Sequence, residues 1–189
     1  MNEKEACLIL KSVCSLSPLK LWNLVKSLGS ACAVLNSSAS LLEKTALLSS
    51  ASLQKILSWE KNPIWKKELK TCESESLSLI TYNSSDYPKL LSKIEDPPIL
   101  LFAKGHTELL SKEGLAIVGT REPSPYGRQA VETICSEVSL SNLVIFSGLA
   151  KGIDQLAHEI ALSKNKDTVA IVPCGLSSIL ENKLATSYL

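Results

Sequence analysis

The sequence lacks the features that mark several large classes of protein. Its longest apolar runs, such as Ile99–Ala103, are only a few residues long, whereas a membrane-spanning helix needs about 20 apolar residues. Charged residues interrupt the first apolar stretch, Met1–Lys11, so it has no basic region followed by an unbroken apolar segment of the kind found in secretory signals. These absences predict a cytoplasmic protein that has no contact with a membrane.

Metal and cofactor motifs are also missing. The six cysteines are scattered without any CxxC pair, and the two histidines, His106 and His158, lie far apart. Zinc sites usually place their ligands in closely spaced pairs. The sequence has no GxGxxG motif, and no lysine follows Gly119 to complete a Walker A loop. We therefore expect reduced, mostly packed thiols, no metal and no cofactor.

The composition is that of an ordinary globular protein. Of the 189 residues, 45% are hydrophobic and 21% are charged, and the formal net charge is +1. The charge is uneven, because residues 1–70 carry +5 and residues 71–189 carry −4. The positive segment is compatible with contact to nucleic acid or with a solvated helical surface, and its charge does not decide between them.

The chain changes character near residue 75. Leucines recur at spacings of three and four residues in the first part, and Gly29 followed by Ser30 is typical of a helix end and a new N-cap. β-Branched residues and prolines become frequent only afterwards. We predict a small all-helical domain over residues 1–72 and a second domain over residues 75–189.

The second domain has the pattern of a parallel sheet. After two short strands, Leu77–Tyr82 and Ile99–Ala103, strands alternate with helices: Leu115–Gly119, a helix from Ser124 to Leu140, Leu143–Phe146, a helix from Ile153 to Lys164, and Thr168–Pro173. Apolar strands in a βαβαβ order predict an α/β fold, a partial Rossmann-like parallel sheet buried on both faces.

Glycine loops follow the three central strands. They read GTREPSPYGRQA from Gly119, SGLAKGIDQLAH from Ser147, and PCGL from Pro173. Ligands of such sheets bind beyond the carboxyl ends of the strands, where glycine amides and helix starts favour an anion. Arg121 and Lys151 supply cations there, and Arg128 is a weaker candidate. The loops therefore predict phosphate binding, and ordinary turn geometry is the alternative for each glycine.

Four other side chains in these loops have two interpretations. Asp154 either caps the following helix or contacts a ligand. Tyr126, the single aromatic in the loops, is either a packed turn residue or a platform for a base. Ser147, Asp154 and His158 suggest a hydrolase, although Ile145 stands where a GxSxG elbow has its first glycine.

Three stretches, AIVGTREPSPYGRQA, VIFSGLAKGIDQLAH and TVAIVPCGL, together with DYPKLL and DPPILLFAKG upstream, resemble the DNA-processing protein A family (DprA, also called Smf) over residues 79–176. The resemblance implies a DNA-binding protein without turnover, active in DNA uptake, natural transformation and homologous recombination. Members protect incoming single-stranded DNA and help to load the recombinase RecA. It also implies single-stranded DNA and RecA as partners, and a homodimer.

The resemblance implies a phosphate pocket in which arginine pairs with the phosphate and glycine amides surround it. Its residues would be Gly119, Thr120, Arg121, Ser147, Gly148, Lys151, Gly152 and Asp154, with Gly175 keeping the end of the third strand open. The family continues beyond the third central strand, whereas this sequence ends in LSSILENKLATSYL, so it resembles a form truncated at the carboxyl end. The alternatives are a Rossmann-like nucleotide phosphoribohydrolase and a truncated, non-functional remnant.

Overall fold

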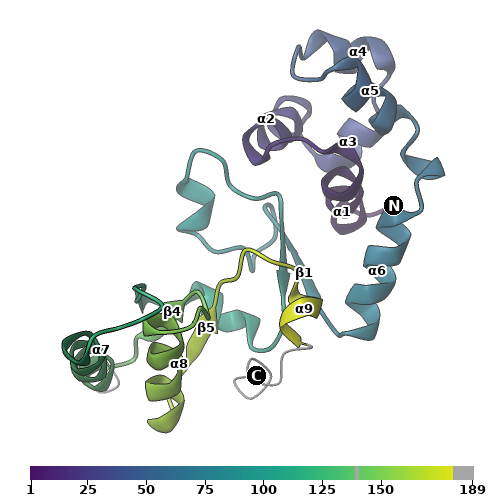
Figure 1. Ribbon diagram of the computed structural model, residues 1–189. Helices are drawn as coiled ribbons and strands as arrows, with labels where there is room; N and C mark the ends of the chain where they lie inside the picture. Colours follow the sequence, from purple (N-terminus) through teal and green to yellow (C-terminus); the bar gives the residue numbers. More distant parts are fainter. Residues whose placement is uncertain (139–140, 181–189) are drawn as a thin grey trace. The chain divides into compact units, whose positions relative to one another are not determined.

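The computed structural model describes residues 1–138 and 141–180, and of Leu180 only the backbone. The chain forms two compact units, residues 1–104 and residues from 105 onward. We refer to them as the helical unit and the sheet unit, and Figure 1 colours them along the chain. Each is described separately.

The helical unit begins with six α-helices. They are α1 (Glu3–Cys14), α2 (Pro18–Leu28), α3 (Ala31–Asn36), α4 (Ala39–Lys44), α5 (Ser50–Leu57) and α6 (Ile64–Ser74), with a short 3-10 helix, η1 (Trp59–Lys61), between the last two. Serine side chains accept the N-cap hydrogen bonds of α2 to α5. Gly29 ends α2 with a φ of 92°, which confirms the helix end predicted there.

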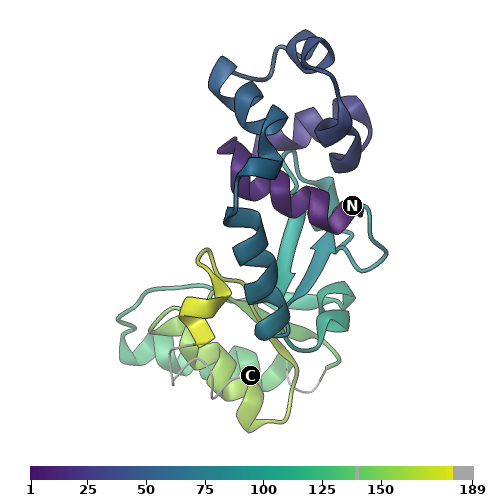
Figure 2. The same ribbon diagram turned by 90° about the vertical axis from the view of Figure 1, so that its right-hand side faces the viewer.

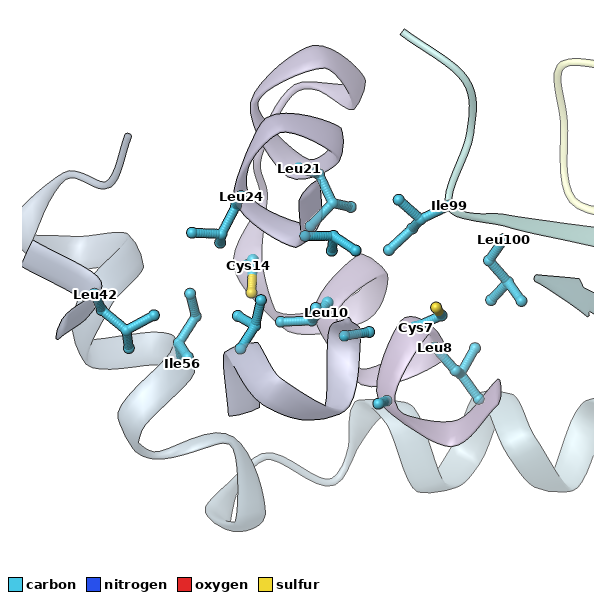
Figure 3. Close-up of a cluster of buried hydrophobic side chains, with 14 of the residues drawn as sticks. Cys7, Leu8, Leu10, Cys14, Leu21, Leu24, Leu42, Ile56, Ile99 and Leu100 are labelled. Carbon is cyan, nitrogen blue, oxygen red and sulfur yellow. The ribbon is translucent and has the colours of Figure 1, made fainter. Parts of the chain in front are cut away.

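The core of the helical unit surrounds α1. Figure 3 shows Leu10 and Cys14 of α1 between the leucines of α2 and Ile56 of α5. Burial raises the pKa of the Cys14 thiol to about 12, because a thiolate loses its hydration there. Cys7 and Cys72 of this unit are also buried, as is Cys135 of the sheet unit, so the predicted packing of most thiols is confirmed.

A two-stranded antiparallel sheet completes the helical unit (Figure 2). β1 (Ser78–Thr81) pairs with β2 (Leu100–Ala103), with Ser78 opposite Ala103. Ile99 and Leu100 are buried in the same cluster as the side chains of α1. The change from helices to strands falls near residue 75 as predicted, but the compact units divide between Lys104 and Gly105. The reason is that this hairpin buries its apolar side chains against α1.

The sheet unit contains the predicted alternation of strands and helices. The 3-10 helix η3 (Thr107–Ser111) is followed by β3 (Gly114–Ala116), α7 (Pro125–Val138), β4 (Val144–Ser147), α8 (Ile153–Ser163), β5 (Thr168–Ala170) and α9 (Leu176–Leu180). The three strands are parallel in the order β3-β4-β5. This confirms the α/β, Rossmann-like class. The predicted end of the α7 helix at residues 139–140 lies outside the described residues.

The helices cover one face of this sheet. Val131 and Cys135 of α7 and Ala157 and Ala161 of α8 pack in one cluster with Ile145 of β4. The prediction that the strands are buried on both faces holds for β4, where the successive residues Val144 and Ile145 are both buried. It is wrong for the outer strands, since Ala116 of β3 and Ala170 of β5 are exposed. The physical reason is that both crossovers run in the same direction along the sheet, so α7 and α8 lie against each other.

Candidate functional site

The helix starts of α7 and α8 meet at one side chain. The loops that follow β3 and β4 lead into these helices at the carboxyl end of the sheet. A Cβ on Gly119 would lie 2.7 Å from Cγ1 of Ile153, and a Cβ on Gly127 would lie 3.8 Å from its Cδ1. Ile153 is thus the packing centre of the loops, a role that no pattern in the sequence indicated.

Gly152 brings the two loops into backbone contact. Its φ is 98°, and a Cβ there would lie 2.7 Å from the Cα of Arg121. The amide of Ile153 donates to the carbonyl oxygen of Thr120 at 3.1 Å. Arg121 therefore lies beside the Lys151–Gly152 backbone, and the side chains of Arg121 and Lys151 are both exposed. The structure brings the backbone of Arg121 against the residue that follows Lys151.

Asp154 joins the loops through its carboxylate, which is buried. Its Oδ1 accepts the amide of Gly119 at 3.2 Å, and its Oδ2 accepts the amide of Gly148 at 3.1 Å. The expectation that these two glycine amides surround a phosphate is therefore wrong, because an internal carboxylate takes both. Asp154 holds the loops together and makes no N-cap bond, since α8 has no side-chain cap.

Ser147 and His158 are also committed to internal hydrogen bonds. Ser147 Oγ donates to the carbonyl oxygen of Ile117 at 2.6 Å, and the residue is buried. The prediction that Ser147 faces a ligand is therefore wrong. Thr168 Oγ1 donates to the carbonyl oxygen of Ile145 at 2.8 Å, and His158 Nδ1 lies 2.7 Å from the same hydroxyl. Since a hydroxyl has one proton, Nδ1 is the donor to Thr168.

This arrangement leaves His158 buried and neutral. Its Nε2 is buried without a hydrogen-bond partner among the described residues. Burial lowers the pKa of His158, and the charge of Asp154 opposes that shift only in part. Ser147, Asp154 and His158 therefore do not form a nucleophile, base and orienting acid, and the hydrolase alternative loses its basis in these residues.

The exposed groups around the loops are suited to an anion. Within the described residues, the backbone amides of four loop residues donate to no acceptor: Thr120, Arg121, Lys151 and Gly152. These amides lie next to the positive ends of α7 and α8 and the two cations. Tyr126, in the first turn of α7, is 81% exposed, which excludes its interpretation as a packed turn residue. We call Thr120, Arg121, Tyr126, Lys151 and Gly152 the rim.

Gly175 differs from the other predicted glycines. It is exposed and precedes α9, where its carbonyl oxygen accepts the hydroxyl of Ser178 at 2.7 Å. No heavy atom lies within 4 Å of the position that a Cβ would take. Packing therefore does not require glycine at this position.

Comparison with known proteins shows which family the chain belongs to. The model of the family described as DNA recombination-mediator protein A matches residues 78–188, more than half of the chain. The chain belongs to this family. It is similar to relatives named DNA processing protein DprA and to one named Protein Smf, so the resemblance to the DprA and Smf family that the sequence indicated is confirmed.

Curated relatives match the family region at moderate identity. The chain is 37% identical to the DNA processing protein DprA of Bacillus subtilis over 62% of this chain and 40% of the relative. It is 46% identical to DprA of Streptococcus pneumoniae over 48% of this chain and 32% of the relative. It is 35% identical to Protein Smf of Escherichia coli over 67% of this chain and 33% of the relative. The matched regions thus cover 32–40% of the length of these three relatives.

A solved structure supports the fold of the family. The X-ray structure of DNA processing protein A from Streptococcus pneumoniae superposes with a TM-score of 0.73 at 28% identity, covering 89% of this chain and 57% of that one. In the part of the chain that the structure describes, no helix combines the length and apolarity required to cross a bilayer. The same residues contain no group of three or more potential metal ligands.

Proposed function

We propose that this chain binds single-stranded DNA through the rim and acts without turnover as a recombination mediator. In this role it protects incoming DNA during natural transformation in the cytoplasm and helps to load the recombinase RecA. The observation that carries the proposal is the backbone contact at Gly152, which places exposed Arg121 beside exposed Lys151. The family membership supports the same class of function.

The chemistry of the rim favours an extended polyanion. Arginine pairs with phosphate oxygens through two parallel N–H groups, and lysine adds a point charge. Exposed Tyr126 offers a ring face on which an unpaired base can stack, and every base has such a face. An interaction of this kind tolerates many sequences and weakens with salt, because bound counterions are released from the strand.

Fluorescence anisotropy of a labelled oligothymidylate tests the proposal. We expect Arg121→Glu and Lys151→Glu each to weaken binding about ten-fold or more. Each should also reduce the salt slope by about 0.7 for every phosphate that the chain no longer neutralises. Lys164→Glu is the matched control, since Lys164 is exposed just after the last turn of the 11-residue α8, about 16 Å from its start.

Two results would contradict the proposal. One is equal affinity of the folded Arg121→Glu variant and the control variant for the oligonucleotide. The other is release of free base from nucleoside monophosphates by the wild-type chain, which would restore the phosphoribohydrolase alternative.

A further inference from the structure

The turn between α5 and α6 exposes several large apolar side chains on the helical unit. Trp59 of η1 and Trp65 of α6 are partly exposed, with ring centroids 5.7 Å apart and an interplanar angle of 59°. Leu57 and Ile64 on either side are 42% and 51% exposed. Large apolar side chains gathered at the surface within one short segment are typical of an interaction site.

The segment that carries the two indoles is rich in lysine. Residues 55–70 contain five lysines and two glutamates. Glu68 is turned towards α1, where its carboxylate accepts the hydroxyl of Ser12. Lys66 Nζ lies 5.5 Å from the ring centroid of Trp65. Among the described residues, none of the lysines at 61, 66, 67 and 70 forms an ion pair, so their charge is available to a partner.

Exposed lysines beside aromatic faces are the combination that binds single-stranded nucleic acid, where cations meet phosphates and rings meet unstacked bases. We propose that the indole–lysine patch, formed by Trp59, Lys61, Trp65, Lys66, Lys67 and Lys70, is a second contact for single-stranded DNA. The choice of this ligand rests on the function proposed for the rim.

Other polyanions fit the patch less well. An acidic peptide would pair with the lysines but would leave the partly exposed indoles without a role. An anionic membrane surface can bind both lysine and tryptophan side chains, but it binds helices that have an apolar face free to enter the lipid. The apolar face of α6 is already used, because Leu69 packs on the core around α1 and Cys72 is buried.

Tryptophan emission reports this contact directly. The chain has three tryptophans, and Trp22→Phe leaves Trp59 and Trp65 as the emitters. The substitution keeps a ring edge-on to Tyr82, whose centroid lies 5.4 Å from that of Trp22. In this background we expect an unlabelled oligothymidylate to quench the emission saturably, because a base stacks on an indole.

Paired lysine substitutions test the charge of the patch in the full chain. Lys66→Gln with Lys70→Gln removes two cations one turn apart on α6, and Lys26→Gln with Lys44→Gln removes two exposed cations on α2 and α4. We expect the first pair to weaken oligonucleotide binding about five-fold or more and to lower the salt slope. The second pair is expected to bind as the wild type does.

The outcomes separate this proposal from that for the rim. Unchanged emission at saturating oligonucleotide, or equal affinity of the two lysine pairs, overturns the patch and leaves the rim intact. Quenching by phosphatidylserine vesicles but not by oligonucleotide overturns it in favour of a membrane surface. Loss of binding in the patch variants but not in Arg121→Glu supports the patch and contradicts the rim.

Discussion

Replacing Asp154 with asparagine removes the charge that holds the two strand-end loops together, with no change in side-chain volume. The carboxylate accepts one amide from each loop, at 3.2 Å from Gly119 and 3.1 Å from Gly148. An asparagine oxygen can replace one of these acceptors. Its NH2 group would then face the second amide, and two donors cannot bond to each other.

The expected loss of stability follows from these bonds. A hydrogen bond to a charged group contributes about 1.5–3 kcal/mol, and a buried donor left without an acceptor costs about 1–3 kcal/mol. The variant loses one bond, weakens the other from charged to neutral, and leaves one amide unpaired. We therefore expect Asp154→Asn to destabilise the sheet unit by about 2–4 kcal/mol.

Hydrogen exchange measured by mass spectrometry checks this value at the loops themselves. Peptides that contain Gly119 and Gly148 should lose protection, since opening of the loops requires less free energy. All three tryptophans lie within residues 1–104, so unfolding followed by tryptophan emission reports the helical unit and should stay unchanged. The two signals together distinguish a local effect from a general one.

The matched control is Asp167→Asn, which removes a surface carboxylate. Asp167 forms an ion pair with Lys112 at 2.8 Å, and both side chains are about half exposed. Such pairs contribute about 0–1 kcal/mol. If Asp154→Asn leaves exchange at both glycines as in the wild type, or is no more damaging than the control, Asp154 does not join the loops in the way argued above.

Three further variants extend the test to other parts of the chain. Because burial lowers the pKa of His158, the unfolded chain takes up the imidazole proton at a higher pH than the folded chain does, and the sheet unit should lose stability as the pH falls below about 6.5. His158→Leu should abolish that pH dependence of the free energy of unfolding, measured by urea titrations followed by circular dichroism. Gly152→Ala should cost about 1–3 kcal/mol from backbone strain alone and weaken oligonucleotide binding, whereas Gly175→Ala should change neither. Leu10→Ala in the fully buried core should lower the stability of the helical unit by about 2–5 kcal/mol, measured by tryptophan emission, while Leu90→Ala, at a site 78% exposed, should have little effect.

Much of the secondary structure was predictable because its signals are local. A run of apolar residues between glycine and proline indicates a strand, and leucines at helical spacing indicate a helix. The predicted helix from Ile153 to Lys164 is observed as Ile153–Ser163, and the strand predicted at Leu143–Phe146 is observed as Val144–Ser147. Gly29 ends a helix because only a residue that tolerates positive φ suits that position.

The roles of single side chains at the site were less predictable. Arg121 and Lys151 were expected together because both follow parallel strands, and the backbone of Arg121 does lie against Gly152, next to Lys151. Gly119 and Ser147 were expected to face a ligand, but Gly119 donates to Asp154 and Ser147 donates to Ile117. A glycine after a strand has the same appearance in the sequence whether its amide meets a phosphate or a carboxylate of its own chain.

The amino-acid sequence by itself determined the order of helices and strands, the parallel α/β class and the position of the cationic loops, because these follow from residue types over a few neighbours. Tertiary structure decided which groups those loops leave free. Asp154 is 35 residues from Gly119 along the chain, and the β1–β2 hairpin joins the helical unit because Ile99 and Leu100 pack on α1. Contacts at such separations depend on how the elements pack in space, and no periodicity in the sequence encodes them.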